Sequence, residues 1–153
     1  LTLERGLPKA LHNFINDIKQ EFTFQLGYSK CRPIFSHQFA LSHLKARGYK
    51  IVVCSNSIRK TIEVLLERSA LAHYLDFYLS NEDVVEPKPN PEIYLVAIKR
   101  LGLDPNECLI LEDNENGIKA AKAAGAHLLI VNDVSEVNID NINRRISSIE
   151  GRL

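Results

Sequence analysis

The sequence predicts an α/β domain in which helices cover both faces of a parallel sheet. Short apolar runs of strand length alternate with segments of helical apolar periodicity, and polar residues follow several of the runs. Strict alternation of strand and helix is typical of right-handed crossovers between parallel strands. We therefore expect an open, three-layer α/β fold with a helical segment at its N-terminal end.

The individual elements follow from spacing and from the residues that end each segment. Pro8 is suited to the first turn of a helix, and Gly27 is expected to end that helix. Apolar residues at three- and four-residue steps predict further helices over 35–47, 58–70, 91–101, 117–124 and 139–149. Apolar runs predict strands over 49–54, 77–79, 108–111 and 127–131.

The composition fits one globular domain and excludes several classes of protein. The chain has 153 residues, 45% of them hydrophobic and 25% charged, and its 19 basic residues balance its 19 acidic ones. This balance gives no global attraction for nucleic acid or for an anionic membrane. The three cysteines form no CxxC pair, so we expect a reducing, cytoplasmic environment. No apolar stretch approaches the roughly 20 residues that span a bilayer.

Ser55 and Asn56 directly follow the first predicted strand and precede a helix. A hydroxyl and free backbone N–H groups at a helix N-terminus suit a phosphate oxygen. The alternative is that either residue only caps its helix. Considered alone, the segment does not decide between the two readings.

Lys88 lies in the stiff segment Glu86-Pro87-Lys88-Pro89-Asn90-Pro91 after the second predicted strand. A lysine held there could neutralise a carboxylate or phosphate at little further loss of freedom. A solvent-exposed lysine in a proline-rich turn is the alternative.

Glu112 and Asp113 follow the third predicted strand, and adjacent carboxylates at a strand end are a typical way to hold Mg²⁺. The alternative, a single acid that caps the next helix, explains one carboxylate and not the pair. Because ligands collect at the carboxyl ends of parallel strands, we expect Ser55, Lys88 and Asp113 to meet at one edge of the sheet.

Three segments resemble the motifs of the haloacid dehalogenase superfamily, in its phosphatase and β-phosphoglucomutase-like branch. They occur in the order and spacing of that superfamily's second, third and fourth motifs: 44–57, with Cys54-Ser55-Asn56-Ser57 at its end; 88–94, Lys-Pro-Asn-Pro-Glu-Ile-Tyr; and 111–125, with Leu111-Glu112-Asp113 at its start. The resemblance covers about residues 33–133. It implies a three-layer Rossmannoid core over 33–153, with 1–32 as a helical remnant of a cap.

The resemblance also implies roles for the matching residues. Ser55, helped by Asn56, would bind the transferring phosphoryl group, and Lys88 would neutralise phosphate and nucleophile together. Asp113 would bind Mg²⁺, with Glu112 beside it as a ligand or as a support. The reaction implied is hydrolysis or transfer of phosphate from a small phosphorylated metabolite through an aspartyl-phosphate.

The sequence departs from the superfamily at its first motif, because it contains no Asp-x-Asp. Asp17 is the one aspartate before Ser55, and it falls within a helical pattern. We therefore expect an incomplete sheet that lacks its first, central strand, with the nucleophile outside this sequence. Such a chain should be inactive alone, and its exposed strand edges favour self-association. The absence of any methionine also fits a sequence shorter than its gene product.

Two other readings remain open. A non-catalytic module, either a pseudo-enzyme or a phospho-receiver, would use similar residues, although a receiver carries its acidic pair after its first strand. A dehalogenase would use the same scaffold without Mg²⁺, which leaves the pair Glu112-Asp113 unexplained.

Overall fold

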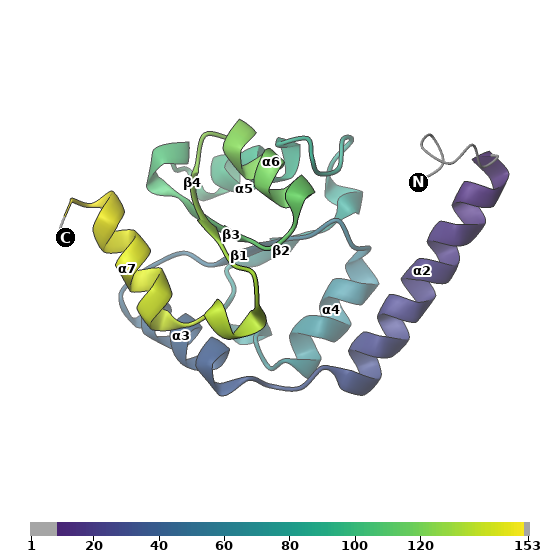
Figure 1. Cartoon of the computed structure of the whole chain (residues 1–153), viewed down its shortest axis with the longest axis horizontal. Helices are drawn as coiled ribbons and strands as arrows, with labels where there is room; N and C mark the ends of the chain where they lie inside the picture. The colour runs from purple at the N-terminus through teal and green to yellow at the C-terminus, as the bar shows by residue number, and fades with distance from the viewer. Residues whose placement is uncertain (1–8, 152–153) are drawn as a thin grey trace.

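The computed structural model describes residues 9–151, and it confirms the α/β class and the parallel strands. Figure 1 shows the strands in the middle, with α5 and α6 on one side and α3, α4 and α7 on the other. The strands are β1 (Val52–Cys54), β2 (Phe77–Leu79), β3 (Leu109–Glu112) and β4 (His127–Ile130). The helices are α2 (Lys9–Lys30), α3 (Phe35–Ala46), α4 (Arg59–Arg68), α5 (Glu92–Leu101), α6 (Glu115–Ala123) and α7 (Ile139–Ile149). Four single 3-10 turns lie in the connections: η1 (Ala72–Tyr74), η2 (Asn81–Asp83), η3 (Pro105–Glu107) and η4 (Val134–Glu136).

Within residues 9–151 the four strands form two separate parallel pairs rather than one sheet. Val53 of β1 lies opposite Tyr78 of β2, and Ile110 of β3 lies opposite Leu128 of β4. Neither β1 nor β3 has a second strand partner in the described part of the chain. The sheet is therefore incomplete, as the sequence predicts.

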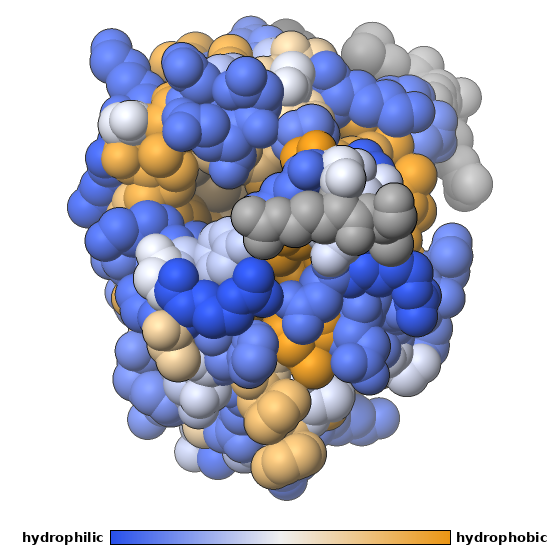
Figure 2. Space-filling model, turned by 90° about the vertical axis from the view of Figure 1, so that its left-hand side faces the viewer, coloured by the Kyte–Doolittle hydropathy of each residue, from blue (hydrophilic) through white to orange (hydrophobic). Residues whose placement is uncertain are grey.

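The free edges of β1 and β3 line one apolar cavity of about 630 Å³, which we call the inter-strand groove. Its walls also include residues of α3, α5 and α7, among them Leu44, Ala97 and Ile142. The space expected for a central strand is thus a groove with a strand edge on each side. On the face that Figure 2 shows, apolar surface is visible near the middle, between polar side chains.

Backbone direction shows which peptide groups face the groove. The carbonyl of Ile51 and the N–H of Ser55 are hydrogen-bonded to the β2 side, to Asp76 N and to Leu79 O. Because successive residues of a strand point to opposite neighbours, the peptide groups of Val52 and Cys54 face the groove.

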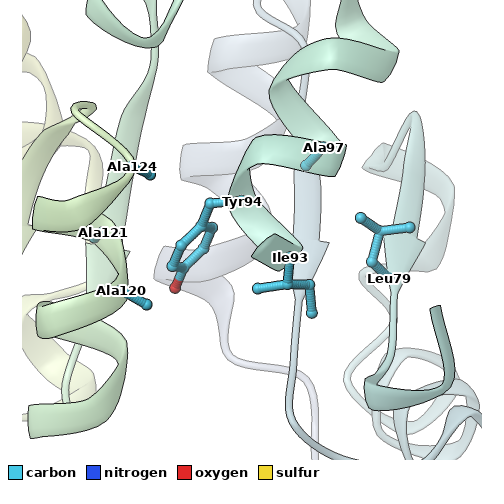
Figure 3. Packing of buried hydrophobic residues seen from close by; sticks show 7 residues of the cluster. All are labelled: Leu79, Ile93, Tyr94, Ala97, Ala120, Ala121 and Ala124. Carbon is cyan, nitrogen blue, oxygen red and sulfur yellow. The ribbon is translucent and has the colours of Figure 1, made fainter. Parts of the chain in front are cut away.

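Two apolar clusters fill the layers on either side of the strands. One joins β2, α5 and α6 through Leu79, Ile93, Tyr94, Ala97, Ala120, Ala121 and Ala124. Figure 3 shows Tyr94 reaching from α5 toward the alanines of α6, whose small side chains leave room for its ring. The other cluster joins Ala40 and Leu44 of α3 to Ile142 of α7.

The prediction that Gly27 ends the first helix is wrong, because α2 continues through it to Lys30. Gly27 is buried against α4, and a Cβ there would lie 2.7 Å from Leu65 Cδ2. The glycine therefore permits a close helix–helix contact, a use that sequence alone does not separate from a helix stop. Pro8, predicted to open this helix, lies outside the described residues.

Much of α2 carries apolar side chains that remain exposed, including Phe14, Phe22 and Leu26. No helix among residues 9–151 is long and apolar enough to cross a membrane. The division of the chain at residues 32 and 33 stays a prediction, although a four-residue connection does separate α2 from α3.

Candidate active site

A cavity of about 430 Å³, here called the polar pocket, lies at the carboxyl ends of β1 and β3. It is lined by all the residues predicted from the three motifs: Ser55, Asn56, Lys88, Glu112 and Asp113. Cys54, Leu111 and Glu112 line both this pocket and the inter-strand groove, so the two cavities adjoin. The structure therefore brings the predicted residues together at one edge of the strands.

Lys88 connects the two strand pairs across the end of the groove. Its Nζ donates to the carbonyl of Cys54 on β1, at 3.0 Å, and to Oε1 of Glu112 on β3, at 2.5 Å. The side chains of Lys88 and Glu112 are 7% and 6% exposed, so this ion pair is well shielded from water. The alternative of a solvent-exposed lysine is wrong for this reason.

Glu112 is held by several donors besides Lys88. The hydroxyl of Tyr94 donates to Oε1, while the backbone N–H of Asp113 and the amide of Asn114 donate to Oε2, at 3.3 and 3.1 Å. These bonds give the oxygens of a buried carboxylate the hydrogen-bond partners that burial requires. Because these hydrogen bonds occupy both oxygens of Glu112, its carboxylate holds the ammonium group of Lys88 in place.

Gly117, in the first turn of α6, lies directly against the carboxylate of Glu112. A Cβ on Gly117 would lie 2.0 Å from Cδ of Glu112, far inside van der Waals contact. The N–H of Gly117 donates to Oδ1 of Asn114, which is the N-cap of α6. Glycine is therefore required here for close approach and not for backbone conformation.

Asn56 fastens the proline-rich loop to the end of β1. Its Oδ1 accepts from Lys88 N–H at 3.0 Å, and its Nδ2 donates to Lys88 O at 3.1 Å. The loop also contains a cis peptide bond between Lys88 and Pro89. Lys88 is thus fixed at both its backbone and its ammonium group.

Ser55 lies in the polar pocket without capping α4, whose N-cap is Ile58. Its Oγ accepts from the N–H of Ser57 at 3.1 Å, which leaves the hydroxyl hydrogen to donate to a ligand. Of the two readings of this segment, helix capping does not hold for α4. Phosphate binding stays a prediction.

Asp113 is exposed in the polar pocket, and its Oδ1 accepts from Asn114 at 3.2 Å. Among residues 9–151 no group of three or more His, Cys, Asp or Glu side chains could hold a metal ion. The exposed carboxylate of Asp113 still fits Mg²⁺, since that ion commonly binds one or two carboxylates and completes its shell with water and phosphate oxygens. These residues can supply part of a Mg²⁺ site.

Burial changes the acidity of two neighbours of the ammonium group. It raises the pKa of the Cys54 thiol to about 12, so this cysteine is no thiolate nucleophile at neutral pH. Burial and the hydrogen bond to Glu112 raise the pKa of Tyr94 well above its ordinary range. Tyr94 is therefore a neutral donor to Glu112.

Sequence reasoning missed one wall of the polar pocket, which α2 supplies through Lys19, Gln20 and Thr23. The available signal was the set of polar residues that alternate with apolar ones along this helix. It is weak, because such residues are usually solvated.

Comparison with known proteins identifies the family of the chain. Residues 12–125 match the family of haloacid dehalogenase-like hydrolases. The match covers most of the chain, and the chain belongs to that family.

Several of the relatives have names that describe phosphatases. YhcW of Bacillus subtilis, a phosphatase-like protein, is 37% identical over 131 residues, which are 84% of this chain and 59% of YhcW. Phosphoglycolate phosphatase of Shigella boydii is 30% identical over 79% of this chain and 45% of its own. The crystal structure of a mutant of CbbY from Rhodobacter sphaeroides, in complex with xylulose 1,5-bisphosphate, matches with a TM-score of 0.67 and 26% identity. It covers 77% of this chain and 54% of CbbY. The chain thus spans about half the length of these relatives.

Proposed function

We propose that these residues form the phosphate- and metal-holding half of a Mg²⁺-dependent phosphohydrolase site. The observation that carries the proposal is the position of Lys88, whose ammonium joins β1 to β3 at the carboxyl end of the groove. A residue at the carboxyl end of a strand in the groove would meet this ammonium. Lysine there suits an anionic nucleophile and a phosphoryl group together.

The chain's own residues have distinct roles in this proposal. The hydroxyl of Ser55 donates to a phosphoryl oxygen, and Asn56 holds the loop that presents Lys88. Asp113 binds Mg²⁺, which supplies charge neutralisation at the phosphoryl oxygens. Glu112 keeps Lys88 in place, and its service as a further metal ligand stays a prediction.

The nucleophile is an aspartate outside this sequence, on a parallel strand that fills the groove. Its carboxylate oxygen attacks phosphorus and the alcohol leaves, and water then releases phosphate from the aspartyl-phosphate. The substrate is a small phosphorylated metabolite, and the site works in the cytoplasm. By this proposal residues 1–153 alone are inactive and expose a strand-binding edge.

The test is hydrolysis of an aryl phosphate by the gene product and by the 153-residue chain, with and without Mg²⁺. We expect Mg²⁺-dependent turnover by the gene product, its loss in Asp113→Asn, and no turnover by the shorter chain. Asp104→Asn, which alters an acid outside the polar pocket, is the matched control and should leave turnover unchanged.

Two results would contradict the proposal. A gene product without turnover would favour a non-catalytic member of the family. Metal-independent release of halide from a haloacid would instead favour a dehalogenase.

A further inference from the structure

The polar pocket is built from two sides, and only one of them belongs to the predicted phosphate site. Ser55, Lys88 and Asp113 come from strand ends, whereas Lys19, Gln20 and Thr23 come from α2. At about 430 Å³ the pocket is of the size that holds a small metabolite rather than phosphate alone. A ligand with its phosphate at the strand ends would therefore extend toward α2.

The lining restricts the chemistry of that ligand. Apart from Cys54 and Leu111, every residue that lines the pocket is polar or charged. A hydrophobic or aromatic group would leave these polar atoms without partners, at a cost in affinity. The part of the ligand beyond its phosphate should therefore be hydrophilic.

Lys19 is the cation of the pocket that has no ionic partner in the part of the chain the structure describes. The charge of Lys88 is compensated by Glu112, while Lys19 is exposed and joins no ion pair among residues 9–151. Asp113, the other acid of the pocket, is the predicted ligand of a divalent cation. The α2 side of the pocket therefore favours a negative charge.

The helix that carries this lysine is anchored to α4 by contacts further along α2. Gly27 packs closely against Leu65 of α4. Lys60 and Arg68 of α4 lie over the rings of Phe24 and Tyr28, at 4.7 and 4.0 Å from the ring centroids. These contacts begin one residue after Thr23, so the segment that faces the pocket is the continuation of an anchored helix.

We infer that Lys19, with Gln20 beside it, selects phosphomonoesters that carry a second anionic group. The phosphate lies at Ser55 and Lys88, and the second anion pairs with the ammonium of Lys19. This inference rests on the proposed phosphate site and adds the substrate class. A carboxylate and a second phosphate share the required chemistry.

The test is calorimetric binding to the gene product that carries these residues. The probes are inorganic phosphate, 2-hydroxyethyl phosphate, phosphoglycolate and ethane-1,2-diol bisphosphate, so that carboxylate and phosphate are compared with a neutral hydroxyl. We expect at least one probe with a second anionic group to bind about fivefold more tightly than 2-hydroxyethyl phosphate. Lys19→Gln should abolish that preference and leave the affinity for inorganic phosphate unchanged.

Lys30→Gln is the matched control, because Lys30 lies on the same helix but outside the pocket, and it should retain the preference. Equal affinity for 2-hydroxyethyl phosphate and for both probes with a second anionic group would overturn the inference while leaving the phosphate site standing. The inference would also be overturned if Lys19→Gln kept the preference for probes with a second anionic group. Failure to bind inorganic phosphate would overturn the proposed function and this inference with it.

Discussion

Replacing Gly117 by alanine tests the geometry of the site most sharply, because packing and helix propensity predict opposite signs. Alanine is favoured over glycine inside a helix by up to about 1 kcal/mol, so propensity alone predicts stabilisation of α6. In the structure the new Cβ would lie 2.0 Å from Cδ of Glu112. One of the two groups must therefore move.

The expected magnitude follows from what holds Glu112. A shifted carboxylate weakens its bonds from Lys88, Tyr94 and Asn114 in a site that is 6% exposed. Disrupting a buried charge pair costs about 3–5 kcal/mol, and overpacking alone about 1–3 kcal/mol. After subtracting the gain in propensity, we expect Gly117→Ala to lower the free energy of unfolding by about 2–4 kcal/mol.

The measurement is urea unfolding followed by circular dichroism, with the slope compared between variants. Gly27→Ala is the matched control, since it too adds a methyl group to a helical glycine. Its clash is with the flexible end of Leu65, so a loss of at most about 1 kcal/mol is expected. Unchanged or increased stability of Gly117→Ala would refute the placement of Glu112 against α6.

Three further predictions concern the support of the site and the strand edges. Tyr94→Phe removes one donor to Glu112 and should lower the free energy of unfolding by about 1–2 kcal/mol, as urea titration would reveal. Backbone N–H groups hold the pKa of Asp76 and Asp83 below the usual value, so both stabilise the fold above about pH 4 and lose that effect as the pH falls further. Asp76→Asn should accordingly flatten the acid limb of a stability–pH curve, and an unaltered limb would contradict this. Val53→Lys, at a position of β1 that lines the inter-strand groove, should weaken concentration-dependent association in sedimentation experiments, whereas a parent chain that stays monomeric would remove the basis for this expectation.

The sequence predicts the alternation of strands and helices and the residues at strand ends because both follow from local pattern. A β-branched run that ends at Ser55, and an apolar run that ends at Glu112, place those residues at the carboxyl edge without knowledge of tertiary contacts. Even the missing centre of the sheet follows from the absence of a motif. The strand ends need only spacing and residue type, whereas the missing centre of the sheet follows only from the resemblance to the superfamily.

Tertiary proximity is what the sequence does not encode locally. Nothing in the helical pattern of α5 distinguishes Tyr94, whose hydroxyl binds Glu112, from an ordinary core residue. Gly27 has the spacing of a helix stop and is instead a packing contact with α4. Lys19 lies far before Ser55 in the sequence, and only the orientation of α2 brings it to the pocket.

The alternation of peptide groups along β1 and β3 has a consequence for amide hydrogen exchange. The N–H groups of Val53 and Ser55 point to β2, whereas those of Val52 and Cys54 face the groove. On β3 the carbonyls of residues 108 and 112 are bonded to β4, so residues 109 and 111 face the groove. In residues 1–153 alone, protection from exchange should therefore alternate along both strands, and it should become uniform once a strand occupies the groove. The amide spectrum thus gives a residue-by-residue readout of whether the sheet is complete.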